Sequence, residues 1–350
     1  MRIGVATVYM PGVRGGAEFL VEGLCTAFAR AGHRVQRILA PFDYAPASHR
    51  SASGLWSGLD LSRYDGAGID RLVCLKYPTW LARHPDTVVW LLHQHRPAFD
   101  LFATPYGFAD DEAGRALAGA IRNVDAEALR RIGRIRTLSA RVSERLLAST
   151  GIVARPLLHP PADAERFEAG PYEPFILAPS RLEGLKRQDL LIDAVAASRI
   201  CVPVAIVGDG GMRAELERKV AALGLQDRVR FLGSVSRETL LALYARCAGV
   251  YFAPVDEDYG YVTLEAMLAA RPVVTCRDSG GPLAFVVDGE TGFVVEPDAR
   301  SVAAALESLL ERPGLAGALG RAGRSRYDEL RLSWDHVVDV LLASDPEAVP

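Results

Sequence analysis

The sequence predicts an α/β protein made of two doubly wound, Rossmann-like domains that face a cleft. Its 350 residues are enough for two domains of ordinary size, which hold about 150 residues each. Short β-branched runs alternate with helical patterns almost throughout, as in parallel sheets built from βαβ units. Residues 159–174 are rich in proline and glycine, so they suit neither a long helix nor a central strand. We therefore expect the linker between the two domains there.

The first half contains six strand patterns and one clear helix. Leu20, Leu24 and Phe28 share one face of a helix expected over 17–31, which Gly32 ends. The run that begins at Ile3 is too short and too regular for a signal peptide. Two segments, 41–60 and 98–120, are expected to be long irregular loops, which often carry function. The expected strands are 3–8, 34–39, 72–75, 88–92, 136–138 and 156–158.

In the second half, strand and helix patterns alternate without a break after the linker. The expected strands are 175–178, 204–207, 229–232, 250–253 and 273–275. The expected helices are 188–196, 213–223, 237–246, 262–270 and 302–310. Because ligands of parallel sheets bind beyond the carboxyl ends of the strands, the loops after these strands are the candidates for a binding site.

The composition argues against several classes of protein. A net charge of −3, with neither half strongly basic, argues against a nucleic-acid partner. No apolar run approaches the roughly 18 residues of a membrane-spanning helix, so we expect a soluble, cytoplasmic protein. The five cysteines stand far apart without a CxxC pair, and we expect buried free thiols rather than a zinc site.

The segment around Glu257 and Glu265 carries the strongest signal. A strand is expected to end at residue 253, the chain to turn at Gly260 and a helix to begin near Tyr261. The N–H groups of a helix N-terminus suit a phosphate, and the carboxylates can accept hydrogen bonds from the vicinal hydroxyls of a sugar or ribose. On these residues alone, Glu257 could equally be a solvated loop charge, and Glu265 a charge that matches the helix dipole.

Two cations follow the strand expected over 175–178. Arg181 and Lys186 lie in the loop at its carboxyl end. Opposite a helix N-terminus, they would bind a diphosphate and neutralise its charge as it leaves. Taken singly, either residue could instead be an ordinary surface charge.

The C-terminal domain resembles the retaining glycosyltransferases of family four, which have the GT-B fold. The family signature is two glutamates separated by seven residues, and Glu257 and Glu265 have this spacing. One departure is Arg271, where the family usually has glycine before a proline. Further matches span the whole domain, at 207–210, 267–274, 279–282 and 288–293.

The N-terminal half resembles the family more loosely. The loop 14–18, which contains Gly15 and Gly16, matches the family's glycine-rich loop. His93 matches the active-site histidine, although a packed histidine is an open alternative and His95 a substitute. Trp334 resembles part of a last helix that crosses back to the N-terminal domain. The resulting domains are 1–165 on the acceptor side, 166–328 for the nucleotide sugar, and 329–350 for the last helix.

The resemblance implies a metal-independent transferase that retains the anomeric configuration. Glu265 would bind the ribose, and Glu257 the 3- and 4-hydroxyls of the donor sugar. Arg181 and Lys186 would stabilise the leaving nucleoside diphosphate, and His93 would touch the transferred sugar. No cofactor and no metal are implied. No dedicated general base is implied either, because the leaving phosphate itself would take the proton of the acceptor. Further donor contacts, mostly from backbone groups, would come from Gly15, Gly16, Gly233, Val235, Gly260, Tyr261, Val262 and Thr263.

The partners implied are a nucleotide-sugar donor and a saccharide or lipid-linked acceptor, the latter bound by N-terminal loops that include 98–120. By analogy, bacterial members serve envelope or exopolysaccharide assembly. Six arginines lie in the stretch 130–145. They could form a solvated surface, or they could support weak peripheral association with the inner face of a membrane.

Alternative hypotheses remain for this fold. A nucleotide-sugar epimerase or a hydrolase could use the same donor site, and a binding module could keep the fold without catalysis. A dehydrogenase would need a GxGxxG motif after a first strand, which neither 14–16 nor 208–211 supplies. The run 256–258 also matches the Asp-x-Asp of metal-dependent transferases with another fold. Since two cations are available for the diphosphate charge, we expect no metal there.

Overall fold

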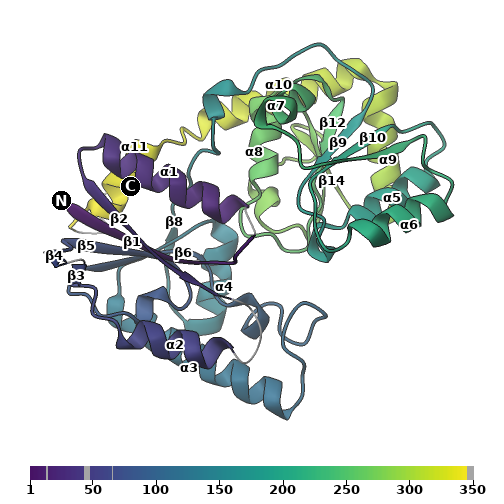
Figure 1. Cartoon of the computed structure of the whole chain (residues 1–350). Coiled ribbons are helices and arrows are strands. Elements are labelled where there is room, and N and C mark those ends of the chain that lie inside the picture. The colour runs from purple at the N-terminus through teal and green to yellow at the C-terminus, as the bar shows by residue number, and fades with distance from the viewer. Residues whose placement is uncertain (13–14, 43–47, 65, 345–350) are drawn as a thin grey trace. The chain divides into compact units, whose positions relative to one another are not determined.

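The structure is a computed structural model and describes residues 1–12, 15–42, 48–64 and 66–344. Its contacts divide the chain into two units, drawn in Figure 1: Met1–His159 together with the chain from Ser333 onward, and Pro160–Leu332. The boundaries expected from the sequence are 165/166 and 328/329. Arg14 of the glycine-rich loop, part of the segment 41–60, and the last residues of 329–350 lie outside the described residues.

The first unit is built on a six-stranded sheet in the order β2-β1-β5-β6-β7-β8. All of these pairings are parallel, as the alternation of strand and helix patterns predicts. The strands β5 and β6 are buried almost throughout, which explains their apolar sequences. The strands are β1 (Arg2–Tyr9), β2 (Arg34–Pro41), β5 (Arg71–Lys76), β6 (Thr87–His93), β7 (Ile135–Thr137) and β8 (Arg155–Pro156), and a small antiparallel pair joins β3 (Arg63–Tyr64) to β4 (Ala67–Gly68).

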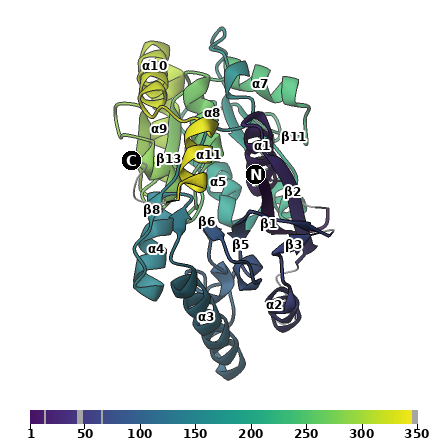
Figure 2. The same cartoon turned by 90° about the vertical axis from the view of Figure 1, so that its left-hand side faces the viewer.

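The helices of the first unit cover both faces of this sheet. Figures 1 and 2 show α1 and α11 on one face, and α2 and α3 on the other. The helices are α1 (Gly16–Arg30), α2 (Ser48–Gly58), α3 (Glu112–Ile132), α4 (Ala140–Thr150) and α11 (Trp334–Leu342), with short 3-10 turns η1 (Thr79–Leu81) and η2 (Arg96–Ala98).

The expectation of irregular loops over 41–60 and 98–120 is wrong in part, because α2 lies in the first segment and α3 begins in the second. The α2 sequence is rich in serine and glycine, which have low helix propensity. Trp56, only 1% exposed, anchors this helix in the core. Asp111 caps α3 through Gly114 N at 2.7 Å. In α2, tertiary packing therefore overrides a weak local signal.

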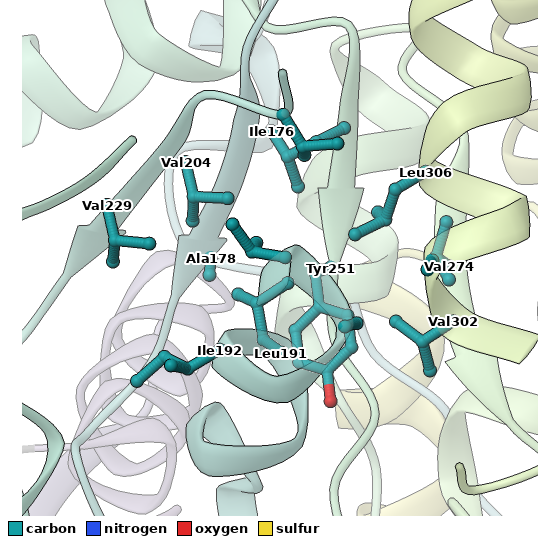
Figure 3. Packing of buried hydrophobic residues seen from close by; sticks show 14 of the residues in the cluster. Ile176, Ala178, Leu191, Ile192, Val204, Val229, Tyr251, Val274, Val302 and Leu306 are labelled. Carbon is teal, nitrogen blue, oxygen red and sulfur yellow. The ribbon is translucent and has the colours of Figure 1, made fainter. Parts of the chain in front are cut away.

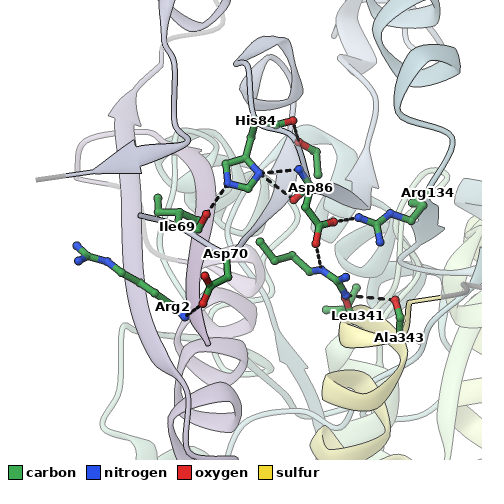
Figure 4. Close-up of polar contacts among 10 residues, drawn as sticks. Arg2, Ile69, Asp70, His84, Asp86, Arg134, Leu341 and Ala343 are labelled. Atoms are coloured by element: carbon green, nitrogen blue, oxygen red, sulfur yellow. Dashed lines mark hydrogen bonds and ion pairs between the residues drawn. The ribbon is translucent and has the colours of Figure 1, made fainter. Parts of the chain in front are cut away.

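The last helix, α11, packs against the first unit, as the family resemblance implies. The indole of Trp334 fits so closely over α1 that a Cβ atom on Gly23 would lie 2.4 Å from it. At the other end, Arg71 donates to the carbonyls of Leu341 and Ala343 at 3.1 and 3.2 Å (Figure 4). A cation at a helix C-terminus is favoured both by the free carbonyls and by the dipole.

The second unit repeats the same architecture with a six-stranded parallel sheet in the order β11-β10-β9-β12-β13-β14. Its core packs the central strands against the neighbouring helices (Figure 3). The strands are β9 (Ile176–Pro179), β10 (Val204–Val207), β11 (Val229–Gly233), β12 (Gly249–Tyr251), β13 (Val273–Cys276) and β14 (Gly292–Val295). The helices are α5 (Gln188–Ala197), α6 (Arg213–Ala222), α7 (Arg237–Arg246), α8 (Tyr261–Leu268), α9 (Ala299–Glu311) and α10 (Pro313–Glu329), with 3-10 turns η3 (Ala164–Arg166), η4 (Gly184–Lys186) and η5 (Gly281–Ala284).

Two elements of the second unit, β14 and α10, are absent from the sequence-based assignment. Gly292 of β14 lies so close to β13 that a Cβ atom would be 2.2 Å from Val273 O. A Cβ atom on Gly320 of α10 would lie 2.0 Å from Ala270 O. Such glycines lower local propensity while permitting close packing, so the pattern hides both elements. Also contrary to expectation, Cys201 is exposed rather than buried.

Among the described residues, no helix combines the length and the apolar composition needed to cross a membrane.

Candidate functional site

Three loops of the second unit meet around Glu257, after strands β9, β12 and β13. The backbone of Glu257 is held like a short strand: its N–H donates to Ser279 O at 2.9 Å, and its carbonyl accepts from Gly281 N at 2.7 Å. Val255, in the same loop as Glu257, donates its N–H to Leu185 O in the loop after β9, at 2.8 Å. Because these strands are neighbours in the sheet, loops distant in sequence are brought to one edge.

Lys186 and Glu257 form an ion pair in this site. The ammonium nitrogen Nζ lies 2.5 Å from Glu257 Oε2, and both side chains are mostly buried, with 16% and 22% of their area exposed. Lys186 also lies over the ring of Phe252, at 5.5 Å from its centroid. A lysine and a glutamate that are 71 positions apart thus present a cation and an anion side by side.

Arg187 joins the loops that surround this ion pair. Its guanidinium donates two hydrogen bonds to the carboxylate of Asp278, at 2.7 and 2.9 Å. The same group donates to Ala253 O at 2.7 Å and to Pro254 O at 2.8 Å. A planar guanidinium suits such a fork, and Lys could not reproduce it. The sequence alone gives Arg187 no role, because its partners lie more than 60 residues away.

Glycines permit the close backbone packing beside Glu257. Gly280 has φ of +70°, and a Cβ atom there would lie 2.7 Å from Glu257 O. Gly260, with φ of +92°, is the N-cap residue before helix α8, and a Cβ atom on it would lie 3.0 Å from Pro282. Both positions require the left-handed backbone that glycine adopts without strain.

Helix α8 starts at Tyr261, at the place where the sequence predicts a phosphate-binding N-terminus. The amides of Tyr261 and Val262 belong to its first turn, whose N–H groups have no partner within a helix. Thr263 differs, because its N–H donates to Gly260 O at 2.9 Å. Its buried hydroxyl has no recorded hydrogen-bond partner among the described residues, and a ligand oxygen within reach would supply one.

Glu265 lies one turn further along α8, and both of its oxygens are engaged. Arg237 donates to Oε1 at 3.0 Å, and the Tyr244 hydroxyl donates to Oε2 at 2.8 Å. Burial raises the pKa of Glu265, against the opposing effects of Arg237 and Tyr244. Arg237 is itself held by Asp163, at 3.1 Å. Neither Arg237 nor Tyr244 belongs to a motif, so the sequence alone does not point to them.

Arg181 has a different ionic partner from Lys186, namely Glu183. Its side chain is 49% exposed, and its guanidinium lies 3.8 Å from the carboxylate of Glu183. Its carbonyl is held by Gln188 Nε2 at 3.0 Å. The structure thus orders the backbone of the loop but leaves the Arg181 side chain in contact with solvent.

The loop expected to bind the base adjoins this one. Gly233 ends β11 with φ of +66°, and its carbonyl accepts from Gly208 N at 2.9 Å. Val235 follows and is half-buried. Gly208 packs in turn against Ser180, so that a Cβ atom on Gly208 would lie 2.1 Å from Ser180 O.

In the first unit, a side chain of helix α1 accepts a hydrogen bond from the backbone of the glycine-rich loop. Gly15 N donates to Glu18 Oε2 at 2.8 Å, and Gly16 is the first residue of α1. Lys76 Nζ lies 3.7 Å from Glu18 Oε1. Lys76 is also the partner of His93 in the parallel sheet, so Lys76, Glu18 and His93 lie near one sheet edge. Glu18 lies within the loop 14–18 expected from the sequence, but neither Glu18 nor Lys76 is among the predicted site residues.

His93 and His95 have different surroundings, although they are two residues apart. His93 is half-buried at the end of β6. His95 is only 2% exposed and packs on His49, with 4.0 Å between ring centroids. Burial, and then the neighbouring His49 and His93, lower the pKa of His95 to about 2. His95 is therefore a neutral core residue, which argues against its use as a substitute for His93.

The described residues of the first unit line hollows at two places, among others. One of about 540 Å³ is lined by Arg83, His84 and Arg131 at the amino ends of the strands, on the opposite edge from His93. The other, of about 390 Å³, is formed by the segment 97–117. It coincides with the loop expected to bind an acceptor.

The arginines of 130–145 do not form one surface. Arg136 is buried in β7. Arg134 pairs with Asp86 (Figure 4), and Arg145 lies 3.7 Å from Asp100. Within the described ranges, no group of three or more His, Cys, Asp or Glu side chains is placed to hold a metal ion.

Comparison with known proteins identifies a family for the second unit. The model of the family "Glycosyl transferases group 1" matches residues 162–326. D-inositol 3-phosphate glycosyltransferase of Streptomyces avermitilis is 30% identical over 298 residues, which are 73% of this chain and 61% of that protein. A GDP-mannose-dependent alpha-(1-6)-phosphatidylinositol monomannoside mannosyltransferase of Mycolicibacterium smegmatis is 34% identical over 227 residues, which are 56% of this chain and 59% of that protein. The match to alpha-1,3/1,6-mannosyltransferase ALG2 of Mus musculus is 36% identical and covers 36% of this chain and 30% of that protein. The chain thus covers less than two thirds of each of these relatives.

Solved structures show the same fold over the whole chain. Sucrose-phosphate synthase from Thermosynechococcus elongatus aligns with a TM-score of 0.78 at 19% identity, over 96% of both chains. Anabaena HepE, solved in complex with UDP and glucose, aligns with a TM-score of 0.71 at 18% identity, over 99% of this chain and 100% of that one. At these identities the likeness establishes the fold, the two-domain GT-B architecture.

Proposed function

We propose that the chain, whose residues 162–326 match the glycosyl transferases of group 1, transfers a sugar from a nucleoside-diphosphate donor to a hydroxyl of an acceptor. The observation that carries the proposal is the ion pair of Lys186, in the loop after β9, with Glu257, in the loop that leads to α8, at a distance of 2.5 Å. A cation for phosphate and a carboxylate for hydroxyls are the two groups that a sugar diphosphate requires.

The donor would be held by groups of the second unit. Glu257 would accept hydrogen bonds from hydroxyls of the donor sugar, while Lys186 and the first turn of α8 would face the diphosphate. Glu265 would accept from the ribose, with Arg237 and Tyr244 holding its carboxylate in place. Relatives support this donor class, since one is named as GDP-mannose-dependent and HepE was solved with UDP.

The transfer would proceed with retention of the anomeric configuration. The bond from the anomeric carbon to the phosphate oxygen breaks, the acceptor oxygen bonds to that carbon on the same face, and the acceptor proton passes to the leaving phosphate. Lys186, and Arg181 once its exposed side chain turns to the ligand, would neutralise the charge that develops. We propose that no metal and no cofactor are needed, because these cations take the role of a metal ion.

The acceptor would be a saccharide or a lipid-linked saccharide. The hollow formed by 97–117 offers it a place in the first unit, where His93 would contact the transferred sugar. Relatives named O-antigen chain mannosyltransferase C, of Escherichia coli, and phosphatidylinositol monomannoside mannosyltransferase support a role in bacterial envelope or exopolysaccharide assembly. A lipid-linked acceptor would bring the protein to the inner face of the membrane.

The test is a thermal-shift panel of nucleoside diphosphates and their sugars in EDTA, followed by a transfer assay. A ligand at about one hundred times its dissociation constant adds roughly 2.7 kcal/mol of stability. We expect one nucleoside diphosphate to stabilise the wild type and Glu257→Gln, and to lose its effect in Glu265→Gln. The control is Glu296→Gln, which removes a carboxylate in an exposed ion pair. NMR of the product should show the anomeric configuration of the donor.

Several outcomes would contradict the proposal. A response that requires a divalent ion would refute metal independence, and a response to NAD alone would refute the donor class. Release of free sugar, or an altered donor without any acceptor product, would identify a hydrolase or an epimerase instead.

A further inference from the structure

The first unit contains a buried carboxylate, Asp125, in the middle of α3. It is fully buried, which is costly for a carboxylate unless donors surround it. Trp80 Nε1 donates to Oδ1 at 2.9 Å, and Gln94 Nε2 donates to Oδ2 at 3.0 Å. Asp125 belongs to none of the sequence motifs, and the proposed donor site does not include it.

The side chain of Gln94 connects Asp125 to a second helix. Its amide oxygen accepts from the Ser149 hydroxyl of α4 at 2.8 Å, while its amide nitrogen donates to Asp125 of α3. Both ends of the amide are therefore fixed, and the residue is only 5% exposed. Gln94 directly follows β6, so this bridge fixes the backbone at the carboxyl end of that strand.

The backbone carbonyl of Gln94 faces the imidazole of His93. The distance from Nδ1 of His93 to Gln94 O is 2.7 Å. A carbonyl oxygen only accepts, so Nδ1 must carry the hydrogen in this contact. In the neutral ring the other nitrogen, Nε2, is then an acceptor, which suits a hydroxyl of a sugar.

We propose that Asp125 is a positioning residue that acts through Gln94 to hold His93 in the tautomer with hydrogen on Nδ1. The proposal rests on the proposed function, in which His93 contacts the transferred sugar. Asp125 itself touches neither donor nor acceptor. Its role is to fix the side-chain amide of Gln94. This holds in place the backbone carbonyl of Gln94, which selects the tautomer of His93.

The chemistry of Asp125 suits this role. Its burial raises its pKa to about 6, against the two hydrogen bonds that lower it. Above that pH the group is an ionised, accept-only carboxylate, which matches its two donors. The Asp125→Asn variant has only one acceptor oxygen. It can keep the bridge if the Gln94 amide turns over, because the Ser149 hydroxyl can also accept.

The direct test is nitrogen-15 NMR of the histidine rings, with His93→Gln to assign the His93 signals. In the wild type we expect hydrogen on Nδ1 of His93. In Asp125→Ala we expect a mixture of tautomers and a kcat lowered about tenfold or more, with a smaller change in KM for the donor. The Asp125→Asn variant should recover most of the kcat. The matched control is Trp80→Phe, which removes the other donor to Asp125 and should leave the His93 tautomer unchanged.

The tautomer is read without activity, which separates this proposal from the proposed function. An inactive wild type whose His93 signals still respond to Asp125→Ala would refute the transferase and leave the positioning role in place. Hydrogen on Nε2 in the wild type would overturn the positioning role, as would a folded Asp125→Ala with unchanged tautomer and kcat. Should Asp125→Ala not fold, Gln94→Met carries the same prediction, since it keeps Asp125 and removes the bridge.

Discussion

Trp334 stacks on His159, with 5.2 Å between the ring centroids and 24° between the ring planes. The chain leaves the first unit after His159 and returns to it at Ser333. This aromatic contact therefore links the two segments at which the chain leaves and re-enters the unit. Burial lowers the pKa of His159 to about 3, so the ring is neutral at physiological pH. Trp90 packs against both rings from the sheet.

This contact predicts that Gly23→Ala destabilises the first unit. A Cβ atom on Gly23 would lie 2.4 Å from Cζ2 of Trp334, so the indole must move away from α1. We expect a loss of about 1–3 kcal/mol in urea unfolding, typical of overpacking. Gly119→Ala in α3 is the control, because nothing lies within 4 Å of its Cβ position, and it should be neutral or slightly stabilising. Equal stability of the two variants would contradict the prediction.

A second prediction concerns Arg187, which holds two loops beside Glu257. Arg187→Met leaves Asp278 and two backbone carbonyls without their donor. We expect a loss of about 2–3 kcal/mol in stability and weaker binding of the nucleoside diphosphate. The control Arg277→Met removes an ion pair in which both side chains are 61% exposed, and should cost less than about 1 kcal/mol. Calorimetry of both variants, with and without ligand, distinguishes the two cases.

Gly280 provides a third prediction through its backbone. Gly280→Ala places a Cβ atom 2.7 Å from Glu257 O at φ of +70°, so the backbone beside the ion pair must shift. We expect donor affinity to fall at least about tenfold. Gly289→Ala has nearly the same φ, +74°, with nothing within 4 Å, and measures the backbone strain alone, about 1–2 kcal/mol. If both variants bind the donor equally well, the close approach to Glu257 has no role in binding.

Asp125 predicts how stability depends on pH. Its pKa is about 6 in the folded chain and 3.8 as the ordinary value. As pH rises from 4 to 6, the unfolded chain loses this proton first, so the contribution of Asp125 to stability falls. The contribution of Asp125 to the free energy of unfolding falls by at most about 3 kcal/mol, and it levels off above pH 6. Unfolding midpoints measured over this range should show a flatter profile for Asp125→Asn than for the wild type, and parallel profiles would contradict the assignment.

Much of the fold follows from local patterns. The alternation of apolar runs with helical spacing predicts two parallel sheets, because strand and helix periods are properties of neighbouring residues. The spacing of Glu257 and Glu265 and the turn at Gly260 likewise predict a helix start beside two carboxylates. Weakly patterned elements, such as α2 with its buried Trp56, escape this argument because packing alone stabilises them.

The partners of the site residues were decided only by the tertiary structure. Sequence alone singled out Lys186, Arg181 and Glu257 as one group, yet strand order pairs Lys186 with Glu257 and leaves Arg181 beside Glu183. The bridge from Asp125 to His93 belongs to no motif at all. The physical reason is that periodicity reports which face of an element is buried, whereas a hydrogen bond needs two atoms brought within about 3 Å by the packing of distant elements.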